Sequence, residues 1–218
     1  MMKTAFVFFF LCSASYAAPS SEQPGSRVPE KAGTYYSDCL SSKEMELLKL
    51  INEYRINNGL APVPVSRSLS TVARTHAVDL HINKPYEHRD YDGSICTLHS
   101  WSDKGKWSPG CYTDDNRHAR LMWNKPKEIT DNAYTGTGYE NVYLTLMKEL
   151  SVIRAFESWE NSPSHNSIIL ELGDWENIGW PAIGVGIYEN VAVIWFGDKA
   201  DPLGAVDPCG GRQDEEKP

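Results

Sequence analysis

The chain has 218 residues, of which 41% are hydrophobic and 23% are charged, and its formal net charge is -8. Binding to phosphate groups needs clustered Lys and Arg side chains, and this acidic chain contains no basic run. The composition therefore argues against nucleic acid and against an anionic membrane surface as partners.

The N-terminus predicts a secretory signal peptide of residues 1–17. Lys3 is followed by an apolar run from Ala5 to Cys12, and Ser15-Tyr16-Ala17 is a small-x-small cleavage sequence. The apolar run is too short to span a bilayer, and we expect no transmembrane segment elsewhere. We therefore expect a secreted protein, extracellular or periplasmic, cleaved after Ala17.

The rest of the chain predicts one domain. Residues 18–40 begin with a stretch rich in Pro, Ser and Gly, which is typical of a flexible lead, and residues 210–218 are a charged, glycine-led tail. About 200 residues remain after cleavage, which is enough to bury a core. We place a single domain at residues 41–209, with an insertion at residues 101–137.

Four cysteines remain once Cys12 is removed with the signal peptide: Cys39, Cys96, Cys111 and Cys209. In an exported chain they predict two disulfides, for which three pairings are possible. We favour Cys96–Cys111, which closes a short loop, and Cys39–Cys209, which joins the two ends of the domain.

Two amphipathic helices are predicted first. Ser41 and Glu44 have the spacing of a capping box, and Asn58-Gly59 is a typical helix end. The second helix begins at Ser66 or Ser68 and carries an apolar stripe that includes His76. We interpret His76 as a buried, hydrogen-bonded core residue.

The segment from Tyr86 to Gly138 lacks clear periodicity, apart from a candidate short strand at Ile95–Leu98. Long irregular segments are usually functional or held by disulfides, and we expect the insertion to form a lid over a cleft. We interpret most of its aromatic residues, and the tryptophans further along the chain, as core or lid packing rather than as a sugar-binding surface.

The C-terminal third predicts a helix from Lys148 to Glu160 followed by two strands. Ile183–Tyr188 and Val191–Phe196 are rich in β-branched residues, and Glu189-Asn190 between them suits a tight hairpin. Gly184 and Gly186 would let a helix pack closely on one face. Helices flanking an antiparallel sheet predict an α+β fold.

Three separated segments contain a chemically competent set: His99, Glu140 and His165. Two imidazoles and a carboxylate suit either a metal site or acid–base chemistry if the three segments converge. The sequence has none of the common motifs of metalloproteases, serine hydrolases or phosphate-binding loops.

The chain resembles the CAP superfamily of cysteine-rich secretory proteins, venom antigens and pathogenesis-related proteins (the SCP domain). The resemblance rests on several short motifs whose order is specific, and the Ser-Pro-x-His form is similar to that of a subgroup common in bacteria. The motifs are Ile51–Leu60, Ala73–Ala77, Leu98–Ser100, Gly138–Asn141, Trp159–His165 and Ile183–Ile187.

The resemblance implies a three-layer α-β-α sandwich with a central antiparallel sheet and a cleft lined by two His and two acidic residues. In some members this cleft binds a divalent metal such as zinc. His99, Glu140 and His165 match three of the four positions. Animal and plant members have an acid where this chain has Ser162, and Glu160 is the nearest candidate for the fourth metal ligand.

We therefore expect a binding module that holds a divalent metal, a lipid, another small ligand or an extracellular protein partner in this cleft. The alternative is a hydrolase in which Glu140 is the catalytic base: a metal-assisted peptidase, or a glycoside-cleaving enzyme that pairs Glu140 with Glu160.

Overall fold

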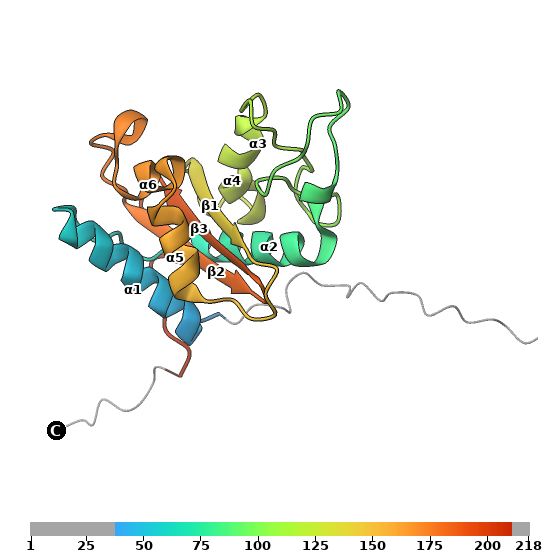
Figure 1. Ribbon diagram of the computed structural model, residues 1–218. Coiled ribbons are helices and arrows are strands. Elements are labelled where there is room, and N and C mark those ends of the chain that lie inside the picture. The colour runs from blue at the N-terminus through green and yellow to red at the C-terminus, as the bar shows by residue number, and fades with distance from the viewer. Residues whose placement is uncertain (1–37, 211–218) are drawn as a thin grey trace, which may run out of the picture. The chain divides into compact units, whose positions relative to one another are not determined.

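A three-stranded antiparallel sheet organises the computed structural model, which describes residues 38–210 (Figure 1). Its strands are β1 (Gly138–Leu144), β2 (Ala182–Tyr188) and β3 (Val191–Gly197), in the order β1-β3-β2. The central strand is therefore β3, and β1 is an edge strand. The predicted signal peptide, most of the predicted lead and most of the tail lie outside the described residues.

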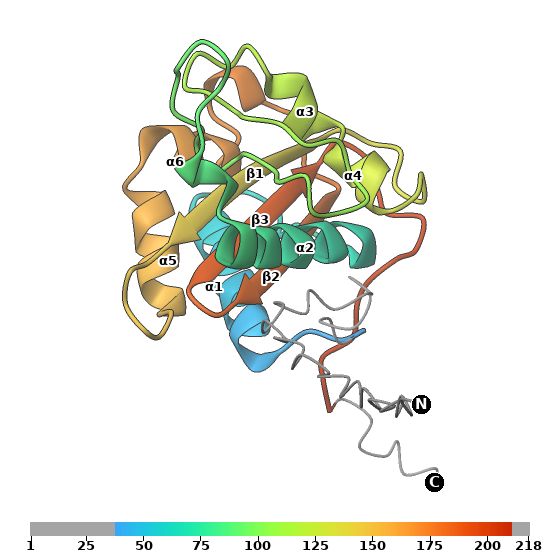
Figure 2. The ribbon, with the colours of Figure 1, turned by 90° about the vertical axis from the view of Figure 1, so that its right-hand side faces the viewer.

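Helices cover both faces of the sheet. In Figure 2, α2 (Arg67–Asn83) crosses in front of the strands and α1 (Ser42–Asn57) lies behind them, where α5 (Val152–Glu160) also packs. Successive side chains of a strand point to opposite faces, so β3 contributes Ile194 and Phe196 to the core under α1 and α5, and Val193 and Trp195 to the core under α2. The predicted α+β fold and its three-layer arrangement are confirmed.

The other elements are short. They are η1 (Pro85–Glu87), α3 (Ala119–Trp123), α4 (Lys125–Ile129), α6 (Pro163–Ile169) and η2 (Gly173–Trp175). Within residues 38–210, the structure has no helix that combines the length and the apolar character needed to cross a bilayer.

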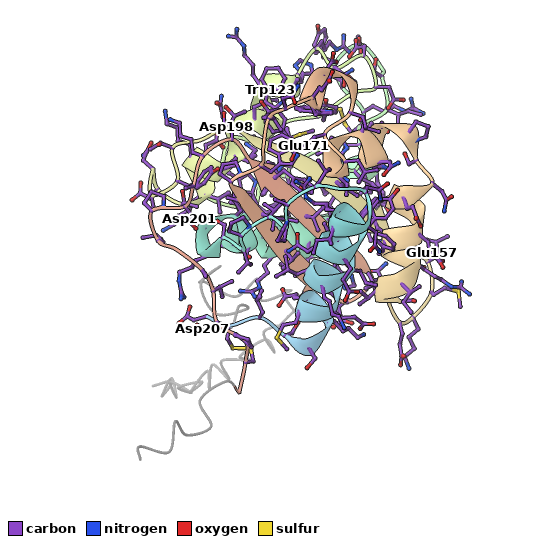
Figure 3. The ribbon with its side chains drawn as sticks, turned by 90° about the vertical axis from the view of Figure 1, so that its left-hand side faces the viewer. Trp123, Glu157, Glu171, Asp198, Asp201 and Asp207 are labelled. Carbon is purple, nitrogen blue, oxygen red and sulfur yellow. A yellow bond between two sulfur atoms is a disulfide. The ribbon has the colours of Figure 1, made fainter. Side chains whose placement is uncertain are left out.

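The predicted helix starts of α1 and α2 are confirmed. Ser41 and Glu44 form the capping box, and the Glu44 carboxylate also accepts a hydrogen bond of 2.7 Å from the Arg74 guanidinium of α2. Ser66 caps α2, and Asp201 accepts hydrogen bonds from the hydroxyls of Ser66 and Ser68 beside the start of that helix (Figure 3). These buried polar contacts fix both helices relative to the sheet.

Gly184 and Gly186 on β2 let α2 lie against the sheet, as predicted. A Cβ atom at Gly184 would come within 2.1 Å of the backbone of Leu69, and one at Gly186 within 2.3 Å of the backbone of Arg74. Both clashes involve helix backbone, which cannot move aside as a side chain can. The α2 helix therefore packs closer to the sheet than any larger residue would allow.

The structure differs from the predicted elements in three places. The helix expected from Lys148 begins at Val152, because Ser151 caps it by accepting a hydrogen bond from the Arg154 amide. Ile95–Leu98 is not a strand: Ile95 forms only an isolated bridge with Arg89, and the next amides bond to separate loops. The segment expected to be irregular contains the two short helices α3 and α4.

Both favoured disulfides are confirmed. Cys39–Cys209 joins the two ends of the described segment, and Cys96–Cys111 closes the loop that carries His99. By closing long and short loops respectively, the two bonds limit the conformations of the unfolded chain and so stabilise the fold.

The close packing of α2 predicts that Gly184→Ala destabilises the protein by about 1–3 kcal/mol, the usual cost of forcing extra volume into a packed core. Gly93→Ala is the control, because a Cβ there meets no atom within 4 Å and only the positive φ of 88° opposes it. Urea unfolding measures both variants. A Gly184→Ala protein as stable as the wild type would contradict this packing.

Candidate functional site

A cleft of about 910 Å³ runs along the outer edge of β1. The chain segment from Thr97 to Trp123 forms one wall, and α6 with η2 forms the other, so that Figure 1 shows β1 between α3 and α6. His99, Glu140 and His165 all line this cleft. The predicted insertion contributes Tyr112 and α3 to the wall.

Glu140 lies at the base of the cleft with a fully buried side chain. It is paired with Trp195 in the sheet and so points to the face covered by α2. Its Oε1 contacts Nδ1 of His76, and its Oε2 lies 2.8 Å from Nδ1 of His99. Because an ionised carboxylate only accepts hydrogen bonds, both imidazoles donate to it.

His76 is fully buried on α2 and faces an acceptor with each ring nitrogen. Its Nε2 lies 3.0 Å from the carbonyl oxygen of Ser100, while its Nδ1 faces Glu140. A ring that donates from both nitrogens is the imidazolium cation. The His76 ring also stacks on Trp101, with ring centroids 4.0 Å apart and an interplanar angle of 6°. The face of an indole ring attracts a cation, so this stacking favours the charged form of His76.

The pKa values of the buried pair agree with this charge assignment. Burial by itself lowers the pKa of His76, but the charge and hydrogen bond of Glu140 and the Ser100 carbonyl raise it above its ordinary value. Burial by itself raises the pKa of Glu140, but His76 and His99 lower it below its ordinary value. Together with the two acceptors that face the His76 ring, these directions favour the ion pair over the neutral pair.

His99 lies in a turn rather than at the strand end expected from the sequence, and its side chain is 20% exposed. Because its Nδ1 donates to Glu140, the carboxylate fixes the tautomer of the neutral ring. In that tautomer Nε2 is the unprotonated nitrogen. The Tyr112 ring packs edge to face with the His99 ring, and the two ring centroids are 5.3 Å apart. His99 is thus held by Glu140 while its ring lines the cleft.

His165 enters the cleft from α6. Pro163 is the first residue of this helix, and Asn141 on β1 donates a 3.1 Å hydrogen bond to the carbonyl oxygen of His165. The Nδ1 atom of His165 is buried and has no hydrogen-bond partner among residues 38–210. Burial, reinforced by the charge of His99 and opposed by that of Glu140, lowers the pKa of His165 to about 4. The ring is therefore neutral at pH 7.

The fourth predicted residue stands apart from this group. Glu160 is the last residue of α5 and is not among the residues that line the cleft. In the described part of the chain, no three His, Cys, Asp or Glu side chains are arranged to hold a metal ion together. The structure therefore brings together His99, Glu140 and His165 but not Glu160. Glu140 accepts hydrogen bonds from two imidazoles.

Sequence reasoning missed the role of His76. Its helical spacing places it on the apolar stripe of α2, and it is indeed buried and hydrogen-bonded, but its partner is the carboxylate of the candidate site. The motif Ala73–Ala77 was the available signal, because it contains a polar residue on an otherwise apolar helix face.

The family model for cysteine-rich secretory proteins (CAP) matches residues 48–190. The chain belongs to the CAP family. The expected family membership is confirmed, while the Ser-Pro-x-His subgroup stays a prediction. No curated protein matches the CAP chain in sequence.

Three solved structures resemble the CAP chain, each over 72% of its length. They are a cysteine-rich secretory protein from Staphylococcus aureus (19% identity, TM-score 0.43), an extracellular SCP-domain protein from Bacillus anthracis (18%, 0.47) and an outer surface protein from Borrelia burgdorferi (20%, 0.42). The match covers 39%, 40% and 92% of those chains, respectively, so this chain spans about two fifths of the first two.

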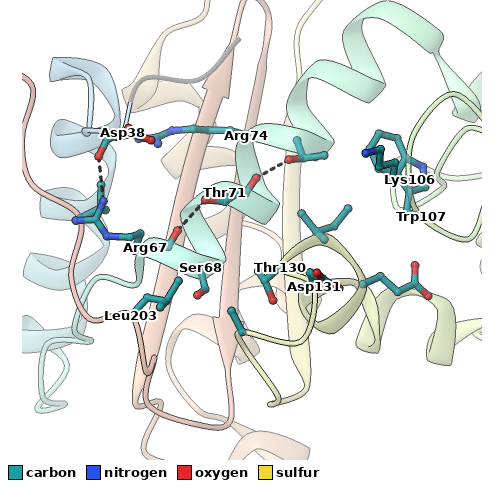
Figure 4. A pocket seen from close by; sticks show the side chains of 15 residues that line it. Asp38, Arg67, Ser68, Thr71, Arg74, Lys106, Trp107, Thr130, Asp131 and Leu203 are labelled. Atoms are coloured by element: carbon teal, nitrogen blue, oxygen red, sulfur yellow. Dashed lines mark hydrogen bonds between the residues drawn. The ribbon is translucent and has the colours of Figure 1, made fainter. Parts of the chain in front are cut away.

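A second pocket of the CAP domain, of about 710 Å³, lies over the outer side of α2 (Figure 4). Arg67, Thr71 and Thr75 line it from the helix, and Trp107 and Asp131 from the insertion. None of the predicted site residues lines this pocket.

The buried ion pair predicts that Glu140→Gln costs about 3 kcal/mol of stability, because it leaves the buried His76 cation without a counter-charge. Glu160→Gln, which changes a carboxylate outside the cleft, should stay within about 0.5 kcal/mol of the wild type. Denaturant unfolding of the two CAP variants at pH 7 compares them. Equal effects would contradict the role given to Glu140.

The low pKa of His165 predicts that this residue lowers the free energy of unfolding as the pH falls. Between pH 6.5 and about 4 the unfolded chain binds a proton at this residue and the folded chain does not, so the stability falls as the pH falls. The His165→Gln variant should lose less stability across this window than the wild type. His88→Gln, which changes an exposed histidine, should follow the wild-type curve.

Unfolding free energies measured at several pH values between 4 and 7 test this difference, and an NMR titration of His165 tests the pKa itself. A normal titration near pH 6.5, or parallel stability curves for the wild type and His165→Gln, would contradict the burial described for this ring.

Proposed function

We propose that this CAP domain is an extracellular binding module that holds its ligand in the cleft along β1. The observation that carries the proposal is the state of Glu140. Both of its oxygens accept hydrogen bonds from imidazoles and its side chain is fully buried, so the carboxylate positions two rings and is not presented to a substrate in the cleft.

Secretion is supported by two features of the chain. The N-terminal sequence has the order of a signal peptide, and all four cysteines within residues 38–210 form disulfides. Disulfides of this kind persist in oxidising compartments outside the cytosol. We therefore propose that the binding module acts outside the cell that makes it.

A divalent metal such as zinc fits two residues of the cleft. His165 is neutral at pH 7, and its Nδ1 has no hydrogen-bond partner in the described part of the chain. His99 donates its Nδ1 to a carboxylate, which is the support that metal-binding histidines usually have. His99 and His165 would hold the metal, with Glu140 orienting His99. A bound zinc ion would supply Lewis acidity at the base of the cleft.

The hydrolase alternative has less support from the geometry. A Glu140 general base would have to reach its substrate from a fully buried position between the rings of His76 and His99. A glycosidase pairing Glu140 with Glu160 needs both carboxylates to face one cleft, and Glu160 does not line it. We therefore place binding ahead of catalysis.

Calorimetric titration with zinc tests the metal-holding role of the cleft. The wild-type protein should take up zinc, the double variant His99→Ala with His165→Ala should lose that uptake, and Glu160→Gln should retain it. Circular dichroism checks that the double variant keeps its fold. Unchanged zinc uptake by a folded double variant would contradict the assignment of the two imidazoles.

A further inference from the structure

Three aromatic rings lie close together in the lining of the cleft. They are Trp123 at the end of α3, Tyr139 on β1 and Trp175 in η2, and we call them the aromatic corner. All three line the cleft, and Trp123, which is labelled in Figure 3, is 39% exposed.

The rings of the aromatic corner stand at steep angles to one another. The centroids of the Trp123 and Tyr139 rings are 6.3 Å apart, and their planes meet at 60°. The centroids of the Tyr139 and Trp175 rings are 4.6 Å apart, and their planes meet at 67°. The contact between Tyr139 and Trp175 is edge to face and leaves no space between those two rings, so a ligand meets the aromatic corner from the cleft. The negative faces of aromatic rings attract an ammonium group with apolar substituents.

The charged residues of the cleft favour the same kind of ligand. Among residues 38–210, no Lys or Arg lines it, whereas Asp114 and Asp174 do, and Asp174 directly precedes Trp175. Within residues 38–210, neither aspartate belongs to an ion pair, and both are exposed. The His76 cation at the base is balanced by Glu140, so the rim is negative.

We infer that the cleft binds an organic cation: an ammonium group with apolar substituents that sits in the aromatic corner beside Asp174. The inference rests on the proposed binding function and specifies the chemistry of its ligand. The cation can come from a free small molecule such as a choline derivative, or from a methylated or basic side chain of an extracellular protein. Both sources present the same group to the same rings.

Titration of the full mature chain with choline tests the inference, and 3,3-dimethylbutan-1-ol is the matched probe because it has the same shape without the charge. Choline should bind, and the neutral alcohol should bind at least about tenfold more weakly, as a desolvated cation–π contact requires. Equal binding of the two probes would overturn the inference, because the cleft would then select apolar shape alone.

Variants locate the site. Trp175→Ala should weaken choline binding about tenfold, and Asp174→Asn, an exposed change that spares the fold, should weaken it several-fold. Tyr91→Ala removes a ring that is 87% exposed but does not line the cleft, and it should bind choline as the wild type does. Undiminished binding by Asp174→Asn and a folded Trp175→Ala protein would overturn the assignment.

A peptide containing trimethyllysine distinguishes the two sources, since tighter binding of the peptide than of choline favours a protein partner and the reverse favours a free molecule. Zinc titration of the same sample separates this inference from the proposed function. Zinc uptake without binding of choline or peptide would overturn the organic cation alone, and loss of both kinds of binding would overturn the binding role of the cleft.

Discussion

The structure of the site depends on one buried carboxylate shared by two imidazoles. Glu140 and His76 form an ion pair from which water is excluded, and His99 completes the hydrogen bonds of the carboxylate. Removing two charges from water is costly, and such a pair survives only if its remaining hydrogen-bonding groups are satisfied. The Ser100 carbonyl satisfies the other nitrogen of His76. The network thereby ties together α2, β1 and the disulfide-closed loop that carries His99.

The position of this network follows from glycines elsewhere in the sheet. Gly184 and Gly186 bring α2 against the strands, and that close approach places His76 next to Glu140 on the same face. The edge position of β1 then leaves the cleft open on the other side of Glu140. The lining of the cleft thus combines imidazoles, aromatic rings and exposed carboxylates. A binding surface with this mixture selects ligands by both shape and charge.

Local signals predicted much of the fold. The caps at Ser41 and Ser66, the hairpin at Glu189-Asn190 and the close-packing glycines each depend on a few neighbouring residues. By contrast, β1 mixes polar and apolar residues and becomes a strand through its pairing with β3. The five-residue helices α3 and α4 are too short for periodicity to show. The partner of His76 was also beyond prediction, since sequence spacing gives the helix face of a residue but not the atom it meets.

The central claim is that His76 is an imidazolium cation at neutral pH, bound to the ionised Glu140. Nitrogen-15 NMR of the histidine rings tests it most directly, because ring-nitrogen shifts distinguish a protonated from an unprotonated nitrogen. The account predicts that both nitrogens of His76 are protonated at pH 7 and that His99 is protonated at Nδ1. A neutral His76 ring at pH 7, with one unprotonated nitrogen, would contradict it.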